Sequence, residues 1–317
     1  MKKITKFTGL ALVALTMTIV GCKKDPDTGS TPIEVPKDAV RFYADNPTAT
    51  DWSIYDVEDL EALSEIVNEG DDFDGMTVTV KRDIVINKNL LTKDFEEPEE
   101  GEDATPNPKF KNLDSIGCGV SADNSEVKPF KGTFDGNGKI ISGLYIYQAH
   151  QGLGFIGVAD GATIKNVILV DACVINKNVW EGVKEDGVTP THDGKDDDRF
   201  GGLIGIVDGE GATIENCLFA GVVGSQAAVD RGSPYEYIGG LIGRADAEAT
   251  VSDSFVFARF YGSREDKADF VCGRYPERLD RTNINGEDDK GVEVKTYDEE
   301  VAAAIEDAIK AVQAKVQ

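Results

Sequence analysis

Short apolar segments recur along the middle of the chain, each bounded by glycine, aspartate or asparagine. Gly154-Phe155-Ile156-Gly157 recurs as Gly202-Leu203-Ile204-Gly205 and again as Gly240-Leu241-Ile242-Gly243. Each copy is followed by a second apolar segment and then by a run rich in Val, Phe and Ala. Such bounded apolar runs are typical of β-strands. A repeated three-strand unit predicts coils that bury their apolar residues by stacking on one another, as in a parallel β-helix.

The second segment of each copy predicts which residues stack. Ile164, Ile214 and Val251 occupy matching positions, so we expect them to form one inward-facing row. Asn166 and Asn216 also match, just before the chain enters its third strand. We expect these two side chains to form an amide ladder at a corner of the coils.

The segment before the repeats combines one helix with further short strands. Residues 56–70 predict a helix capped by Asp56 and ended by Gly70, placed over the open end of the solenoid. Residues 83–86 predict an early strand. Residues 130–146 predict alternating strands around a turn at Asn137-Gly138, where positive φ is needed.

The C-terminal segment predicts an amphipathic helix. Thr296-Tyr297-Asp298-Glu299 has the spacing of a capping box. An apolar stripe follows, made by Val301, Ile305, Ile309, Val312 and Val316. This helix is expected to cap the far end of the solenoid, to pack on its side, or to bind a partner.

The N-terminal residues predict export and lipid attachment. Three lysines precede a short apolar run that ends at Gly21-Cys22, which is typical of a secretory signal followed by a lipid-acceptor cysteine. We expect residues 1–21 to be a signal peptide, Cys22 to carry the lipid (palmitate among its acyl chains), and residues 22–38 to be a flexible tether. The expected location is the outer membrane, exposed at the cell surface. Residues 39–285 would form the β-helix domain and residues 286–317 a C-terminal helical segment.

The charge of the chain limits its partners. The formal net charge is −25, and loss of the three signal lysines would take it to about −28. Such a surface repels nucleic acid and disfavours polyanionic ligands unless a local basic patch intervenes. The acidic run at residues 94–103 is expected to be a solvated loop.

The remaining cysteines leave their pairing open. An exported protein can form disulfides, and spacing does not decide among partners for Cys118, Cys173, Cys217 and Cys272. Cys217 lies in an apolar run, so we expect it to be a buried core thiol.

These motifs together resemble a known family. The Phe-x-Gly-x-Phe-Asp-Gly-x-Gly-x-x-Ile-x-Gly-Leu segment, the Gly-Leu-Ile-Gly repeats and the Thr-Ile-x-Asn blocks are similar to those of the GLUG-motif β-helix proteins, found in bacterial surface lipoproteins and adhesins. The resemblance covers roughly residues 50–262. It implies an all-β, pectin-lyase-like, right-handed parallel β-helix used in surface attachment or extracellular binding. It supplies no catalytic residues, cofactor or metal.

Two long insertions carry the candidate binding residues. Residues 176–200 and 225–238 follow the third strand of successive coils, so they should emerge side by side. Aromatic rings stack on sugar rings, and Asp and Arg bind hydroxyl groups. The candidates for a glycan or protein ligand are Trp180, Asp196, Asp198, Arg231, Tyr235 and Tyr237. The alternatives are that the aromatics pin the loops to the coils, or that the aspartates bind calcium.

Two classes of function remain at this point. The favoured one is a noncatalytic binding or adhesion protein with a glycan or protein ligand. The other is a polysaccharide lyase or hydrolase on the same fold, which needs placed acids and bases. The strands of the repeats carry few charges, and the chain has only two histidines. These observations favour binding.

Overall fold

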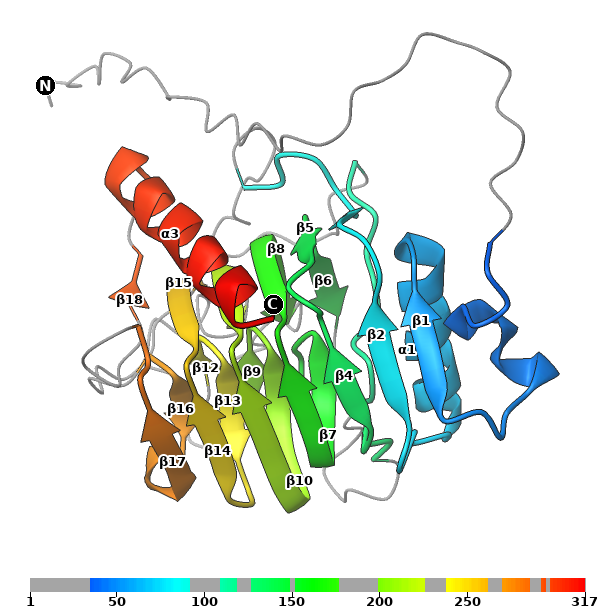
Figure 1. Cartoon of the computed structure of the whole chain (residues 1–317). Helices are drawn as coiled ribbons and strands as arrows, with labels where there is room; N and C mark the ends of the chain where they lie inside the picture. The colour runs from blue at the N-terminus through cyan, green and yellow to red at the C-terminus, as the bar shows by residue number, and fades with distance from the viewer. Residues whose placement is uncertain are drawn as a thin grey trace, which may run out of the picture.

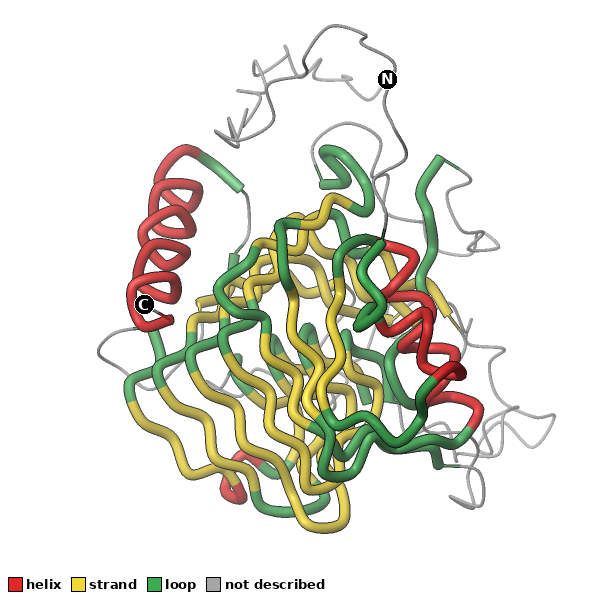
Figure 2. The backbone as a smooth tube through the Cα atoms, turned by 45° about the vertical axis from the view of Figure 1, so that its right-hand side comes forward, coloured by secondary structure: helices red, strands yellow, loops and turns green. Residues whose placement is uncertain are grey.

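The chain folds mostly into parallel β-sheets with few helices (Figure 1). The computed structural model describes residues 35–91, 109–118, 127–148, 152–176, 199–225, 238–261, 270–285, 292–294 and 297–316. Consecutive turns of chain stack on one another, as the tube in Figure 2 shows. Every pairing between two named strands is parallel, which is the arrangement of a parallel β-helix.

The first sheet has nine strands and runs the length of the stack. Its order is β1-β2-β4-β7-β10-β13-β16, with β14 and β17 joined to it through β10. The strands are β1 (Asp51–Ile54), β2 (Thr77–Val80), β4 (Thr133–Asp135), β7 (Ile156–Lys165), β10 (Ile204–Glu215), β13 (Ile242–Ala245), β14 (Ala249–Ser252), β16 (Cys272–Arg274) and β17 (Leu279–Thr282).

Two further sheets complete the β-structure of the described residues. The second sheet has seven strands, and the third has two. The second comprises β3 (Ile84–Val85), β5 (Ile140–Ser142), β6 (Tyr145–Gln148), β8 (Ile168–Asn176), β11 (Leu218–Ser225), β15 (Phe255–Tyr261) and β18 (Val292–Glu293), and the third comprises β9 (Phe200–Gly201) and β12 (Ile238–Gly239). Residues 177–198, 226–237 and 262–269, which connect strands of the second sheet to the next coil, lie outside the described residues, so closure into a right-handed solenoid stays a prediction.

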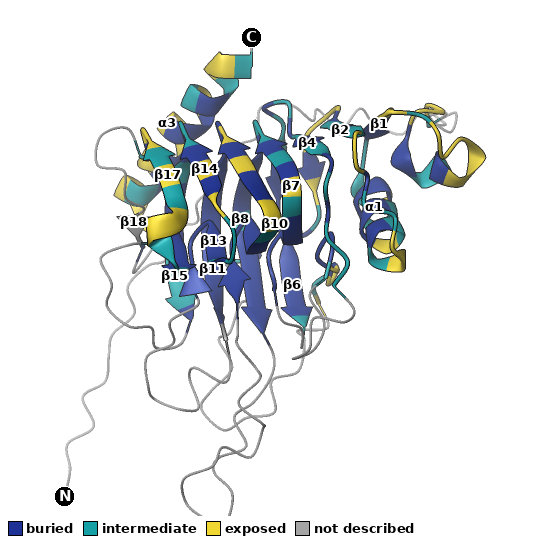
Figure 3. Cartoon of the chain, turned by 90° about the horizontal axis from the view of Figure 1, so that it is seen from below, coloured by how far each residue is buried: buried dark blue, intermediate teal, exposed yellow. Residues whose placement is uncertain are grey.

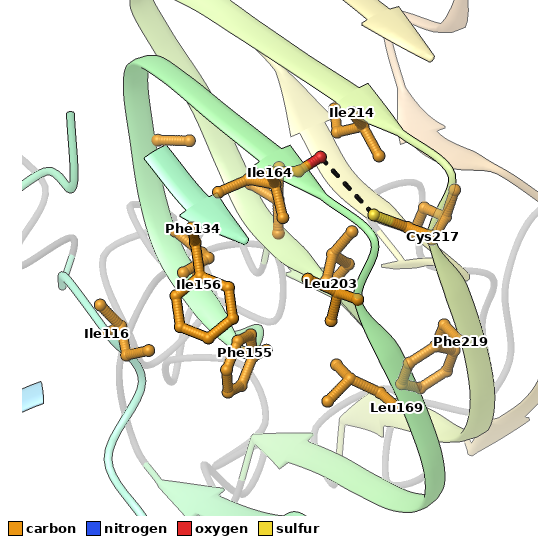
Figure 4. Close-up of a cluster of buried hydrophobic side chains, with 14 of the residues drawn as sticks. Ile116, Phe134, Phe155, Ile156, Ile164, Leu169, Leu203, Ile214, Cys217 and Phe219 are labelled. Atoms are coloured by element: carbon orange, nitrogen blue, oxygen red, sulfur yellow. Dashed lines mark hydrogen bonds between the residues drawn. The ribbon is translucent and has the colours of Figure 1, made fainter. Parts of the chain in front are cut away.

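The predicted inward-facing row is confirmed. Ile214 pairs with Ile164 on one side and with Val251 on the other, and all three are fully buried. The row continues through Phe134 and Val78 toward the N-terminal end. Figure 4 shows Phe134, Ile164 and Ile214 directed into a common apolar interior. Each coil therefore completes its core only with the side chains of its neighbours.

The predicted amide ladder is also confirmed. Asn216 Nδ2 donates to Asn166 Oδ1 at 2.8 Å, and Asn166 Nδ2 donates to Asp135 Oδ1 at 2.9 Å. Both asparagines have positive φ, 56° and 53°. Asparagine tolerates this left-handed conformation better than most residues, which explains its recurrence at the corner.

The turn at Asn137-Gly138 has the expected positive φ at both residues. It does not join a hairpin, however. β4 belongs to the first sheet and β5 to the second, so the turn is a corner between sheets.

A further coil was missed by the sequence analysis. β16 pairs with β13, and β17 pairs with β14, which makes residues 270–285 another copy of the repeat. In this copy Arg281 takes the row position that Val251 holds in the coil before. A charged residue at an inward position ends the apolar row at this coil.

The N-terminal helical elements pack beside β1. The short η1 (Val40–Asp45) precedes it, and α1 (Val57–Glu69) follows it. The Asp56 carboxylate accepts from the backbone N–H groups of Glu58 and Asp59, and Gly70 ends α1 with φ of 116°, as predicted. The buried face of α1 contributes Leu60, Leu63 and Val67 to the main core.

The C-terminal helix α3 (Glu299–Val316) packs on the side of the second sheet. Its buried residues Ile305, Ile309 and Val312 join the outward-facing side chains of β8, β11 and β15 in one cluster. The predicted cap at Thr296 is wrong, because the Asp298 carboxylate accepts from the N–H groups of the second and third helical residues. An aspartate two residues later thus caps the helix.

None of the four described cysteines forms a disulfide. Cys217 is fully buried, as predicted, and its thiol donates to the carbonyl oxygens of Ile164 and Glu215 (Figure 4). Burial raises the pKa of the Cys217 thiol to about 12.

Candidate functional site

The two predicted insertions leave the stack from neighbouring positions. β8 ends at Asn176 and β11 ends at Ser225, and these two residues are paired. Gln148, at the end of β6, pairs with Asn176 as well. In Figure 3 the ends of β6, β11 and β15 gather on one side of the molecule. The prediction that the insertions share a side is therefore confirmed for their points of departure.

The chain also returns at a shared position. Leu153 bridges Phe200, and Phe200 pairs with Ile238, each residue marking the start of the next coil. On this side of the stack, strands end at residues 148, 176, 225 and 261, and the next coils begin at residues 153, 200 and 238. We call this side the loop edge.

The predicted ligand and lipid-attachment residues lie outside the described residues. They are Trp180, Asp196, Asp198, Arg231, Tyr235, Tyr237 and the expected lipid-acceptor Cys22.

A buried aromatic cluster forms the base of the loop edge. The rings of Tyr145 and Tyr147 are stacked, with centroids 6.0 Å apart and planes 5° apart. Tyr261 and Cys173 belong to the same buried cluster, together with Leu90, Ile175 and Val222. Burial raises the pKa of Tyr147 and that of the Cys173 thiol well above their usual values. Both groups therefore stay protonated near neutral pH.

A polar groove crosses the outer face of the first sheet. It has a volume of about 630 Å³ and follows β7, β10, β14 and β17. Thr213 and Thr250 are paired, exposed and line its floor. The charged side chains that line it are Glu210, Glu248, Glu277, Arg278 and Asp280. Hydroxyl groups flanked by carboxylates suit a ligand that is rich in hydroxyl groups.

A group of arginines near one end of the groove was not singled out from the sequence. The guanidinium carbons of Arg244, Arg274 and Arg278 lie 5.5, 4.8 and 4.5 Å from the centroid of the Tyr275 ring. The signal was present, because Gly243-Arg244 and Gly273-Arg274 occupy matching positions of successive coils. It was missed because the coil that contains Arg274 was not recognised.

The described residues offer no other obvious site chemistry. Within them, no group of three or more His, Cys, Asp or Glu side chains is arranged to hold a metal ion. None of the described helices is long and apolar enough to cross a membrane.

Comparison with known proteins adds a similarity of fold. No protein-family model and no curated protein matches the chain. The structure is similar to the crystal structure of a "putative immunoglobulin A1 protease" from Bacteroides ovatus, with 16% identity and a TM-score of 0.40. The similarity covers 74% of this chain and 67% of the other.

Proposed function

We propose that this chain is a noncatalytic lipoprotein of the outer membrane, exposed at the cell surface, whose β-helix domain binds a glycan or a surface protein. The lipid anchor would be at Cys22. The fold would be a right-handed solenoid of the GLUG-motif type, with α1 at its N-terminal end. The parallel sheets support this fold, and the resemblance of the repeat motifs supports the surface role.

The pairing of Asn176 with Ser225 carries the binding proposal. Because both insertions start from paired residues of neighbouring strands, their first residues are about 4.8 Å apart in the direction of stacking. The aromatic and charged residues that follow can then act on one ligand from two successive coils. A solenoid commonly binds its partners through insertions on one face.

A glycan array with the full chain in detergent tests the proposal. Trp180→Ala and Tyr235→Ala should each weaken binding of the selected glycan by about 10- to 100-fold, which corresponds to about 1–3 kcal/mol for a central anchor. Tyr55→Ala is the matched control, because it removes an aromatic ring next to β1, at the N-terminal end of the first sheet. Equal affinities for all three variants and the unchanged chain would refute the shared surface.

The anchor is tested separately. Cys22→Ala should prevent incorporation of labelled fatty acid and should release the protein from the outer-membrane fraction. Incorporation that persists in this variant would show that Cys22 is not the acceptor.

The groove supports one second candidate function. Four carboxylates line it, from Glu210, Glu248, Glu277 and Asp280, and a polysaccharide lyase or hydrolase needs placed acids and bases. Incubation of the full chain with acidic polysaccharides distinguishes the two candidates. Appearance of an unsaturated sugar product or of new reducing ends would replace the noncatalytic proposal with this one.

A further inference from the structure

The polar groove presents negative charge that has no cationic partner. The groove lies on the outer face of the first sheet, where Figure 3 shows β7, β10, β14 and β17 side by side. Its carboxylates are those of Glu210, Glu248, Glu277 and Asp280, and all four residues are exposed. Within the described part of the chain, none of these four side chains forms an ion pair or accepts a hydrogen bond. All four carboxylates are therefore available to a ligand.

Arg278, the basic residue that lines the groove, is already engaged. Its guanidinium donates to the carbonyl oxygen of Ala245 at 3.2 Å and to that of Asp246, and it lies 4.5 Å from the centroid of the Tyr275 ring. A guanidinium held by two backbone oxygens and a ring is not free to cross the groove to the carboxylates. With four carboxylates and one guanidinium, the lining has a formal charge of −3.

The same face of the sheet is compensated closer to its N-terminal end. Lys131 lies 3.3 Å from the carboxylate of Asp160, and Lys165 lies 3.5 Å from that of Asp135. Interspersed charges of both signs are usual on a protein surface. The groove departs from this arrangement, so its negative charge is a local feature and does not simply reflect the acidic composition of the chain.

A bulge in β10 forms one wall of the groove. Residues 209–211 stand opposite Gly161 of β7 alone. The first and last residues of the bulge are glycines with positive φ, 55° and 87°, which lets the chain turn outward. Glu210, between them, donates its N–H to Asp160 Oδ1 at 2.7 Å, which fixes the bulge. A Cβ atom added at Gly161 would lie 3.5 Å from the Glu210 carboxylate, so the bulge holds this carboxylate beside the groove.

The floor of the groove repeats a hydroxyl group from coil to coil. Thr213 and Thr250 line the floor and are paired in one outward row, which Thr163 precedes and Asp280 follows. Neighbouring strands lie about 4.8 Å apart, so polar groups recur at this interval along the stacking direction. A threonine hydroxyl both donates and accepts hydrogen bonds. The floor therefore suits a linear polymer that carries hydroxyl groups on each unit.

The carboxylates are spread along the groove and do not converge on one point. Within the described residues, no three acidic, histidine or cysteine side chains are arranged to hold a metal ion. The carboxylates come instead from three successive levels, with Glu210 on β10, Glu248 just before β14, and Glu277 and Asp280 at β17. This distribution is complementary to a ligand that carries several separate positive charges.

We infer that the groove binds a linear glycan of amino sugars, whose protonated amines face the carboxylates and whose hydroxyl groups follow the threonine row. Hydrogen bonds from an ammonium group to a carboxylate are charge-assisted and stronger than neutral ones. A basic peptide would match the charge but would leave the hydroxyl groups of the floor without partners, so the groove favours the sugar. This inference goes beyond the proposed function, because the groove is a second binding surface and no residue of the loop edge lines it.

The test uses the full chain in a nonionic detergent and a fluorescent glucosamine hexamer, with binding followed by anisotropy. The measurement is made at about pH 5.5, where carboxylates are generally ionised and the sugar amines are protonated. The hexamer should bind, and added salt should weaken its binding. The N-acetylated hexamer should bind at least about tenfold more weakly, because acetylation removes the positive charges.

Three variants locate the binding and identify the class of ligand. Glu248→Gln should weaken binding of the glucosamine hexamer about tenfold. Glu65→Gln is the matched control, because it removes the same charge from an exposed residue of α1, at the other end of the first sheet. Thr250→Val keeps the branched shape and removes the hydroxyl group, so it should weaken binding of the sugar about threefold and leave binding of a lysine hexamer unchanged.

Each result supports or overturns the inference. Absence of binding, or equal affinity for the two sugar hexamers, overturns it. Equal losses in Glu248→Gln and Glu65→Gln overturn it as well, because net charge alone would then explain binding. Unchanged sugar binding in Thr250→Val assigns the groove to a basic peptide instead. Melting temperatures equal to that of the unchanged chain show that each variant is folded.

The insertions provide the comparison with the proposed function. Trp180→Ala and Tyr235→Ala should leave the affinity for the glucosamine hexamer unchanged. Losses in these two variants, with none in Glu248→Gln, place binding on the insertions, which supports the proposed function and overturns this inference. Losses in Glu248→Gln alone, together with a glycan array that shows no dependence on the two aromatic residues, support the groove and refute the shared surface of the insertions.

Discussion

Asn216 joins the corner ladder to the C-terminal helix α3. Its Nδ2 donates to Asn166 Oδ1 at 2.8 Å and to the carbonyl oxygen of Val312, in α3, at 3.0 Å. The side chain is buried. Asn216→Asp keeps the size of the side chain and its tolerance of positive φ, but it replaces the donor with an acceptor that faces two acceptor oxygens.

The expected loss follows from these contacts. Two hydrogen bonds of about 1 kcal/mol each disappear, which gives about 2 kcal/mol. The uncompensated buried charge brings the total to about 3–5 kcal/mol near neutral pH. With a slope of about 3 kcal/mol per molar urea for a domain of this size, the unfolding midpoint should fall by more than about 1 M.

The pH dependence provides an internal check. Burial beside two acceptors should raise the folded-state pKa of the introduced carboxyl group above its unfolded value of about 3.9. The part of the loss that is due to the charge should therefore be absent below the unfolded pKa and should grow as the pH rises through the folded pKa. Asn283→Asp, in the exposed part of the same ladder, is the control and should cost less than about 1 kcal/mol. Equal losses in the two variants, or a loss that does not change with pH, would refute this account of the ladder.

Three further outcomes are expected. Ile214→Asp should abolish the cooperative urea transition, because a carboxylate would lie between two fully buried neighbours, whereas Thr213→Asp on the exposed face should change the unfolding free energy by less than about 1 kcal/mol. The hydrogen bond from Lys315 lowers the pKa of Asp253, so its stabilising contribution should be present above about pH 4 and lost as the pH falls further; urea titrations of Asp253→Asn at several pH values should lack this component. The Cys217 thiol should resist alkylation at about pH 8 in the folded chain and react once urea unfolds it, as mass spectrometry of the labelled chain would show.

The second apolar segment of each copy was sufficient to predict the register of the central coils. Ile164, Ile214 and Val251 hold the same place within that segment, although they lie 10, 12 and 11 residues after the first glycine of their motifs, and stacked coils place such residues in one row. The asparagine ladder followed from the same alignment. Both predictions depend on local sequence and on a fold in which each coil contacts its neighbours only.

Predictions were less successful where the repeat pattern was weak or where two nearby residues could serve the same role. The coil at residues 270–285 keeps the backbone path and the second motif glycine, Gly273, but Phe270 replaces the first glycine and Arg281 replaces the inward apolar residue. The sequence offers both Thr296 and Asp298 as caps for α3, and Asp298 is the residue that caps it. The group of arginines around Tyr275 includes Arg274 of that coil, so it could not be predicted from the pattern of the first three copies.

The position of α3 has a mechanical consequence. Backbone hydrogen bonds between coils lie along the stacking direction, so a force applied along the stack would load them in tension and separate the coils one at a time. The C-terminal part of α3 contacts three of four successive levels: Gln313 donates to the Gly138 carbonyl oxygen at 3.1 Å, Val312 accepts from Asn216, and Lys315 lies 2.6 Å from Asp253. A helix attached at three levels resists separation of the coils that it contacts. Separating any of these coils then requires the whole helix to detach first, which distributes the force over the stack.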